Sequence, residues 1–486
     1  MVDQAVGAPP ARTLSGSLGV PSIVFMVVAA AAPLTVIAGV VPIGFLVGNG
    51  AGFPAMFVVA AMILLLFAFG FTAMTRTIPK AGAFFTYIAH GLGRPSGLAG
   101  AYLALLCYMA VEVGVFGYVG AATRDGILRL DGPEITWWVI SGIIIAAVGA
   151  LGFRHIELSS KVLAILLVLE IAIVVLVSLA VVFSGGASGL DAKPFDPDLV
   201  TSGSPSLALM FAIAGFIGFE ATAIFRDEAH DPDRTVPRAT FLAVIIIGVF
   251  YAFSSWALVM AWGSDEVVAA AAEDPAGFVI NTAMNELGTF GEVAVNVLLI
   301  TSVFAAALSF HNIIARYLHT MSSAGLLPKV LSGVHGRHRS PSAASLATTL
   351  VAASCLTVCV IAGMDPYLKI FAWFVGVGSL CIIILMAATC LAVIRYFRGR
   401  DGESQLRVLA APLLGLLGLA TVAVVTAKNF PLLVGDVDDA GSPRFGVVSI
   451  GLLVLVGAVI VIGYVQAYVL RSRRSPSYDR IIDALS

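Results

Sequence analysis

Twelve long apolar segments dominate this sequence and constrain its fold more than any other feature. They are residues 20–47, 53–74, 97–122, 136–153, 160–183, 206–225, 238–262, 290–320, 342–363, 367–397, 407–427 and 446–470. A hydrocarbon core about 30 Å thick needs about 20 apolar residues per helix. Inside it the backbone must bond to itself, which favours helices. The sequence therefore predicts an all-α, polytopic membrane protein with twelve transmembrane helices.

Charge and cysteine usage exclude several classes of function. Charged residues make up 12% of the chain and the formal net charge is −2, whereas soluble domains carry about 25% charged residues. Nothing in this balance indicates nucleic acid as a partner. The five cysteines lie in apolar segments and lack the spacing of a metal site or a disulfide framework. We expect neither a metal nor another cofactor, and the lipid bilayer as the surrounding solvent.

The basic residues predict the topology. With the N-terminus in the cytoplasm, 21 of the 27 lysine and arginine residues fall on the cytoplasmic side, as the positive-inside rule requires. We therefore expect a multi-pass protein of the cell (inner) membrane with both termini cytoplasmic. The predicted parts are an N-terminal tail (1–19), five helices (20–183), an extracytoplasmic loop (184–205), five more helices (206–397), helices eleven and twelve (407–470) and a C-terminal tail (471–486).

Two predicted helices contain features that interrupt a membrane helix near its middle. In the first, Pro33 follows four alanines and removes a backbone donor; in the sixth, Gly215 and Gly218 loosen the chain. Matched breaks in two repeats are typical of transporters, and unwound main chain can hold a carboxylate and an ammonium group. The alternative is a proline kink and close packing of small residues. The candidate substrate-binding residues at the breaks are Ala31, Ala32, Pro33, Leu34, Thr35, Ala214, Gly215, Phe216, Ile217 and Gly218.

Several motifs resemble those of the amino acid–polyamine–organocation superfamily of permeases. They are Gly218-Phe219-Glu220 with the loop 231–239, the stretch 79–93 before the third helix, and the run 312–328 with Ser340-Pro341. The resemblance implies a five-plus-five inverted repeat, the LeuT-like fold, with helices eleven and twelve outside it. It also implies alternating access around a site between helices one, three, six, eight and ten. The family's first break is usually glycine-rich, whereas the matching region of this chain, residues 31–35, reads Ala-Ala-Pro-Leu-Thr.

Three carboxylates, Glu112, Glu170 and Glu220, fall deep within predicted spans. A charge there is costly, so each is a functional candidate. Some proton-coupled relatives place a lysine at about the position of Glu170, and the resemblance makes Glu170 the candidate proton-coupling group. The alternative is a protonated carboxyl bonded to a neighbouring helix. Glu112 falls where the family often lines the substrate pocket, and could bind the ammonium of a diamine or cationic substrate or make a structural hydrogen bond. Tyr108 and Phe216 are aromatic residues that could close the site, and we expect Phe216 to cover the solute.

The remaining candidates concern gating and the coupling ion. Glu220 is expected to cap freed amides at the sixth-helix break and, with Phe219 and Arg316, to take part in gating. Hydroxyls of the eighth helix, such as that of Ser302, could bind sodium, or could bond back to their own helix.

The sequence predicts a secondary transporter that moves amino acids or related amines by proton-coupled symport or exchange, with sodium as the alternative ion. No paired nucleophile and base is recognisable, so an enzyme is not expected. A transporter of the major facilitator type or a membrane-embedded enzyme are the alternatives.

Overall fold

The computed structural model describes residues 18–78, 84–154, 160–335, 340–400 and 402–484. The described residues are helical apart from loops and two isolated β-bridges. Most of the predicted N-terminal tail, residues 79–83 of the motif before the third helix and the last two residues lie outside the described residues.

The first five predicted spans correspond to helices of varied regularity. Their elements are α1 (Val20–Ala30), α2 (Pro33–Thr35), η1 (Val36–Val40), α3 (Val41–Ile43), η2 (Gly44–Asn49), η3 (Gly50–Gly52), α4 (Phe53–Thr77), α5 (Phe84–Leu92), α6 (Arg94–Arg129), α7 (Trp137–Phe153) and α8 (Ser160–Ser184). Helix α5 is an additional short helix between the second and third predicted spans.

The next five predicted spans follow after a loop that contains short helical turns. Their elements are η4 (Lys193–Phe195), α9 (Pro197–Val200), α10 (Pro205–Ala214), α11 (Ala221–Ile224), η5 (Phe225–Glu228), α12 (Pro232–Trp262), α13 (Val267–Glu273), α14 (Phe278–Ser323), η6 (Lys329–Ser332), α15 (Ser342–Ile361), η7 (Pro366–Phe371) and α16 (Ala372–Phe397). The C-terminal elements are η8 (Leu406–Ala410), α17 (Ala411–Val434), α18 (Val447–Ser472) and α19 (Pro476–Ala484).

The prediction of a loop between the sixth and seventh spans is wrong in part. Residues 231–239 were expected to form a loop, but α12 begins at Pro232 and contains Pro237 in its second turn. Pro237 removes the intrahelical bond to the Asp233 carbonyl oxygen, and this oxygen accepts a hydrogen bond from Arg76 at 2.9 Å instead. Helix α14 is kinked at Gly288, which has φ 64° and ψ −157°, and the predicted eighth span begins two residues later.

Nine described helices are long and apolar enough to cross a membrane. One of them, Val20–Thr77, contains two predicted spans, which separate at Gly48, where φ is −100° and ψ −122°. Two shorter apolar helices, Trp137–Phe153 and Pro205–Ala214, coincide with the fourth span and the first part of the sixth. The count of twelve stays a prediction.

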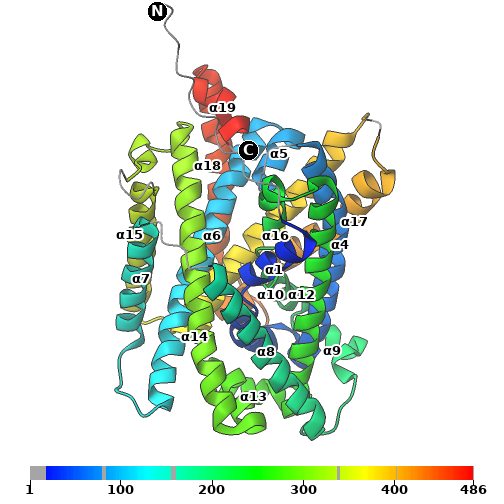
Figure 1. The fold of residues 1–486 in the computed structure, drawn as a ribbon, viewed down its shortest axis with the longest axis vertical. Helices are drawn as coiled ribbons and strands as arrows, with labels where there is room; N and C mark the ends of the chain where they lie inside the picture. The colour runs from blue at the N-terminus through cyan, green and yellow to red at the C-terminus, as the bar shows by residue number, and fades with distance from the viewer. Residues whose placement is uncertain (1–17, 79–83, 155–159, 336–339, 401, 485–486) are drawn as a thin grey trace, which may run out of the picture.

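The elements sort to the two ends of the bundle as the predicted topology requires. Figure 1 shows α5 and α19, from the predicted cytoplasmic side, at one end, and α9 and α13, from the predicted outer loops, at the other. The first and sixth helices, α1 and α10, lie near the middle. Around them α6 is the most enclosed, with 83% of its apolar window buried, against 17% for α18. Helix α6 is thus part of the central scaffold, and α18 presents its apolar side chains to lipid.

Candidate functional site

The first membrane helix is interrupted near its middle. Helix α1 ends at Ala30, and Ala32 adopts the left-handed conformation with φ 45° and ψ 68°. The chain becomes helical again at Pro33, which has no amide to donate. The Tyr251 hydroxyl of α12 donates to the Ala31 carbonyl oxygen at 3.4 Å. The predicted break in the first helix is confirmed.

The sixth helix is broken at matching depth. Helix α10 ends at Ala214 and α11 begins at Ala221, and between them Gly218 has a φ of 110°. The Glu220 carboxylate accepts the Gly218 amide at 2.9 Å, as expected for a cap on freed backbone. A Cβ at Gly218 would lie 3.3 Å from the backbone of Ala30. The two breaks are therefore in contact.

A small cavity of about 50 Å³ lies between the two breaks. The first break contributes Ala31, Ala32 and Thr35, and the sixth contributes Ala214 and Ile217. The other lining residues are Ala30, Val36, Val40, Val111, Val115, Ala306, Phe310, Phe371 and Val375. The remaining candidates at the breaks, which do not line it, are Pro33, Leu34, Gly215, Phe216 and Gly218.

Two predicted substrate-binding residues of α6 bind protein groups instead. The Tyr108 hydroxyl donates to Glu220 at 2.9 Å. Glu112 lies 3.0 Å from His311 Nδ1, and both side chains are 1% exposed. The cavity is lined by Val111 and Val115, and Glu112 lies about 100° around the helix from Val111. The structure thus favours the alternative of a structural hydrogen bond for Glu112.

Phe216, which was expected to cover the solute, does not line the cavity, and its role stays a prediction. Its ring is 1% exposed and packs edge-on against Tyr251 with ring centroids 6.1 Å apart. A Cβ at the preceding Gly215 would approach the same tyrosine at 3.1 Å and Val36 at 3.0 Å. The backbone turn at the break directs this part of the sixth helix toward α12, away from the cavity.

Glu170 of α8 connects directly to the first break. Its carboxylate accepts the Ser302 hydroxyl of α14 at 2.8 Å, and Ser302 lies 2.9 Å from the Thr35 hydroxyl. The backbone amide of Leu34 lies close to the same carboxylate. Thr35 also lines the cavity, so the side chains of Ser302 and Thr35 connect Glu170 to the cavity wall.

Comparison with known proteins decides the family. The family model described as "Amino acid permease" matches residues 18–459. The chain belongs to the amino acid permease family. The low-affinity putrescine importer PlaP of Escherichia coli K12 is 23% identical to this permease over 60% of the chain, a match that covers 63% of PlaP.

Two further relatives agree with this assignment, and one solved structure shares the fold. The aromatic amino acid transport protein AroP of Escherichia coli K12 is 25% identical over 77% of this permease and 82% of its own length. The branched-chain amino acid permease BcaP of Bacillus subtilis is 25% identical over 61% and 65%. A manganese transporter of Eremococcus coleocola shares the fold, with a TM-score of 0.54 and 13% identity over 94% of this permease and 98% of that chain.

An aromatic layer separates the cavity of this permease from a pocket at the predicted outer face. Phe371, which lines the cavity, stacks on Tyr367 with centroids 5.7 Å apart and on Tyr118 at 4.8 Å. The Tyr367 hydroxyl donates to the Gly39 carbonyl oxygen at 2.7 Å. This bond ties the tenth predicted helix to the first.

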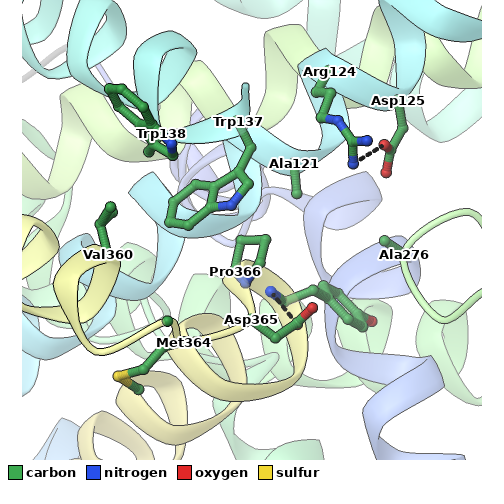
Figure 2. Close-up of a pocket in the computed structure, with 12 residues that line it drawn as sticks. Ala121, Arg124, Asp125, Trp137, Trp138, Ala276, Val360, Met364, Asp365 and Pro366 are labelled. Carbon is green, nitrogen blue, oxygen red and sulfur yellow. Dashed lines mark hydrogen bonds and ion pairs between the residues drawn. The ribbon is translucent and has the colours of Figure 1, made fainter. Parts of the chain in front are cut away.

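The pocket beyond that layer has a volume of about 530 Å³ and contains charged groups. Figure 2 shows the ion pair of Arg124 with Asp125 on one side, Asp365 with Pro366 on another, and the ring of Trp137 beside them. Asp365 caps the start of η7, accepting two backbone amides at 2.9 Å and 2.6 Å. Tyr367 lines this pocket, so one layer of rings divides outer pocket from central cavity.

The predicted gating residues lie in different surroundings. Phe219 is 2% exposed and packs edge-on against Phe67 of α4 with centroids 5.8 Å apart. Glu220 joins the break to Tyr108, whereas Arg316 is exposed on α14. On the predicted cytoplasmic side of the break, the Leu18 amide donates to the carbonyl oxygen of Glu228, the last residue of η5, at 2.9 Å. Phe219 and Glu220 are thus placed on the predicted cytoplasmic side of the cavity, and Arg316 is not brought to them.

Sequence reasoning missed the apolar walls of the cavity. Three helices each supply two lining residues four positions apart: α6 supplies Val111 and Val115, α14 supplies Ala306 and Phe310, and the η7–α16 helix supplies Phe371 and Val375. This spacing places each pair on one helix face. The signal was hidden because these helices are apolar on most faces.

Proposed function

We propose that this permease moves an amino acid or related amine across the cell membrane by alternating access, with the central cavity as its substrate site. The observation that carries this proposal is that two helix breaks in contact enclose one cavity. Broken helices offer main-chain donors and acceptors at membrane depth, which suit the carboxylate and ammonium groups of an amino acid. Relatives whose names specify putrescine, aromatic and branched-chain amino acids support a solute that bears an amine.

The layers on either side of the cavity support alternating access. The stack of Tyr118, Tyr367 and Phe371 covers the outer side, and Phe219 with its ring partners covers the other. Opening one layer while the other stays closed would expose the cavity to one face at a time. The predicted orientation, with both termini in the cytoplasm of the cell (inner) membrane, belongs to this proposal.

We propose Glu170 as the proton-coupling group. A neutral carboxyl can donate a hydrogen bond, whereas a carboxylate accepts several and attracts nearby donors. Loss or gain of a proton therefore changes the attraction between Glu170 and the Ser302 hydroxyl, which itself contacts Thr35 at the first break. The same three oxygen-bearing groups could hold sodium, so sodium is the alternative coupling ion. The family assignment excludes the two alternatives, a transporter of the major facilitator type and a membrane-embedded enzyme.

Transport by the purified full chain in proteoliposomes tests this proposal. An inward pH gradient should drive accumulation of a labelled amino acid, with no requirement for sodium. Glu170→Gln should abolish this accumulation while solute exchange continues, because the cavity itself is unchanged. Ser178→Ala is the matched control, since Ser178 is buried in the same helix and bonds to its own helix at Val174.

Three results of these transport assays would contradict different parts of the proposal. Normal pH-driven accumulation by Glu170→Gln would contradict the role of Glu170. A strict sodium requirement would replace the proton by sodium, and the absence of any solute flux or exchange in the wild type would overturn the transport proposal itself.

A further inference from the structure

We propose that the substrates are neutral α-amino acids with short aliphatic side chains, such as alanine and valine; this inference rests on the proposed function. The side chains that line the central cavity are alanine, valine, isoleucine and phenylalanine, with Thr35 as the polar exception. No charged side chain of the described residues lines it. The solute's own charges would therefore meet the main chain at the two breaks and the Thr35 hydroxyl, without a counter-charge from a side chain.

The three buried carboxylates do not line the cavity and already have partners. Glu112 binds His311 at 3.0 Å, Glu170 binds Ser302 at 2.8 Å, and Glu220 binds both Tyr108 and the Gly218 amide at 2.9 Å. A second ammonium group on a diamine or a cationic amino acid would enter the cavity without a counter-charge. Burying an unpaired charge is strongly unfavourable, so this site disfavours putrescine and arginine. Glutamate meets the same penalty, because no cationic side chain of the described residues lines the cavity.

The size of the cavity limits the side chain of the solute. Its volume is about 50 Å³, and its walls include Val111, Val115 and Val375, whose branched side chains have few rotamers. The rings of Phe310 and Phe371 close two further sides. Phe371 is held by the stack with Tyr118 and Tyr367, so it cannot turn aside alone. The cavity has room for only a few water molecules, so an aromatic side chain would have to displace several walls at once, whereas a methyl or isopropyl group would displace fewer.

Competition in a counterflow assay tests this inference. Proteoliposomes that contain the full chain are loaded with unlabelled alanine, and uptake of labelled alanine is measured. One unlabelled competitor at a time is added outside: alanine, valine, phenylalanine, arginine, glutamate or putrescine. We expect valine to compete within a few-fold of alanine, and the other four to compete about tenfold or more weakly, as expected when a pocket discriminates by size and charge. Arginine, glutamate, putrescine or phenylalanine competing as well as alanine would overturn the inference.

A wall variant tests the role of the lining directly. Val111→Ala should improve competition by phenylalanine several-fold, because Val111 lines the cavity. Val113→Ala is the matched control, since Val113 is buried in the same helix but does not line the cavity. An equal response of both variants would contradict the assignment of the walls, and the wild-type panel decides the inference if Val111→Ala does not fold.

The two proposals fail in different ways. Counterflow of a labelled cationic or aromatic solute without counterflow of alanine would reject the substrate class and leave the transport mechanism standing. Absence of counterflow with every solute would reject the proposed function.

Discussion

Substitution of Gly218 by alanine should slow transport through strain at the contact between the two helix breaks. Gly218 has a φ of 110°, which side chains of L-residues rarely adopt, and such backbone strain costs about 1–3 kcal/mol. The new Cβ would also lie 3.3 Å from the backbone of Ala30, a tight contact with atoms that cannot rotate away. A penalty of this size corresponds to about a 5- to 150-fold fall in the population of the conformation in which the two helix breaks are in contact.

The assay is the initial rate of counterflow in proteoliposomes, with thermal unfolding in detergent as the check on folding. Gly142→Ala is the control, because a Cβ there meets nothing within 4 Å and Gly142 lies within regular helix α7. The Gly218 variant should lose rate by the factor given above, while the control transports normally. A wild-type rate for Gly218→Ala would refute the argument that transport depends on the close contact of the two breaks.

Three further substitutions have defined outcomes. Ser302→Ala removes the link from Glu170 to the first break and should weaken pH-driven accumulation while exchange continues; equal loss of both would contradict this. Tyr367→Phe removes one buried hydrogen bond, worth about 0.5–1.5 kcal/mol, and should increase labelling of a cysteine placed in the cavity by an external thiol reagent; unchanged labelling would count against the outer layer. Glu112→Ala leaves His311 without its carboxylate and should lower thermal stability with unchanged competition by arginine; altered competition would place Glu112 in the substrate site.

The fold was predictable because its signals are local. Long apolar segments follow from the thickness of the bilayer, and Pro33 and Gly218 each mark a break through a property of a single residue. The partner of Glu220 at the sixth break was likewise expected, since its carboxylate lies two residues from the Gly218 amide. Such features depend on few residues and short sequence separations.

The composition of the cavity was not predictable in the same way. Glu112 was a candidate for binding an ammonium group, but its partner His311 is 199 positions away in the chain. Nothing in the sequence of α6 tells which of its apolar faces meets the cavity, because the helix is buried on most sides. The placement of Tyr108 against Glu220 depends in the same way on how two distant helices pack.

The central claim is that the solute binds between the two helix breaks, and a structure of the permease with its transported amino acid bound tests it most directly. We predict that the carboxylate and ammonium groups of the solute contact main chain at residues 31–35 and 214–218, with its side chain directed toward Val111 and Phe371. A solute found in the outer pocket beside Arg124, with an unoccupied and continuous helix pair at the centre, would contradict it.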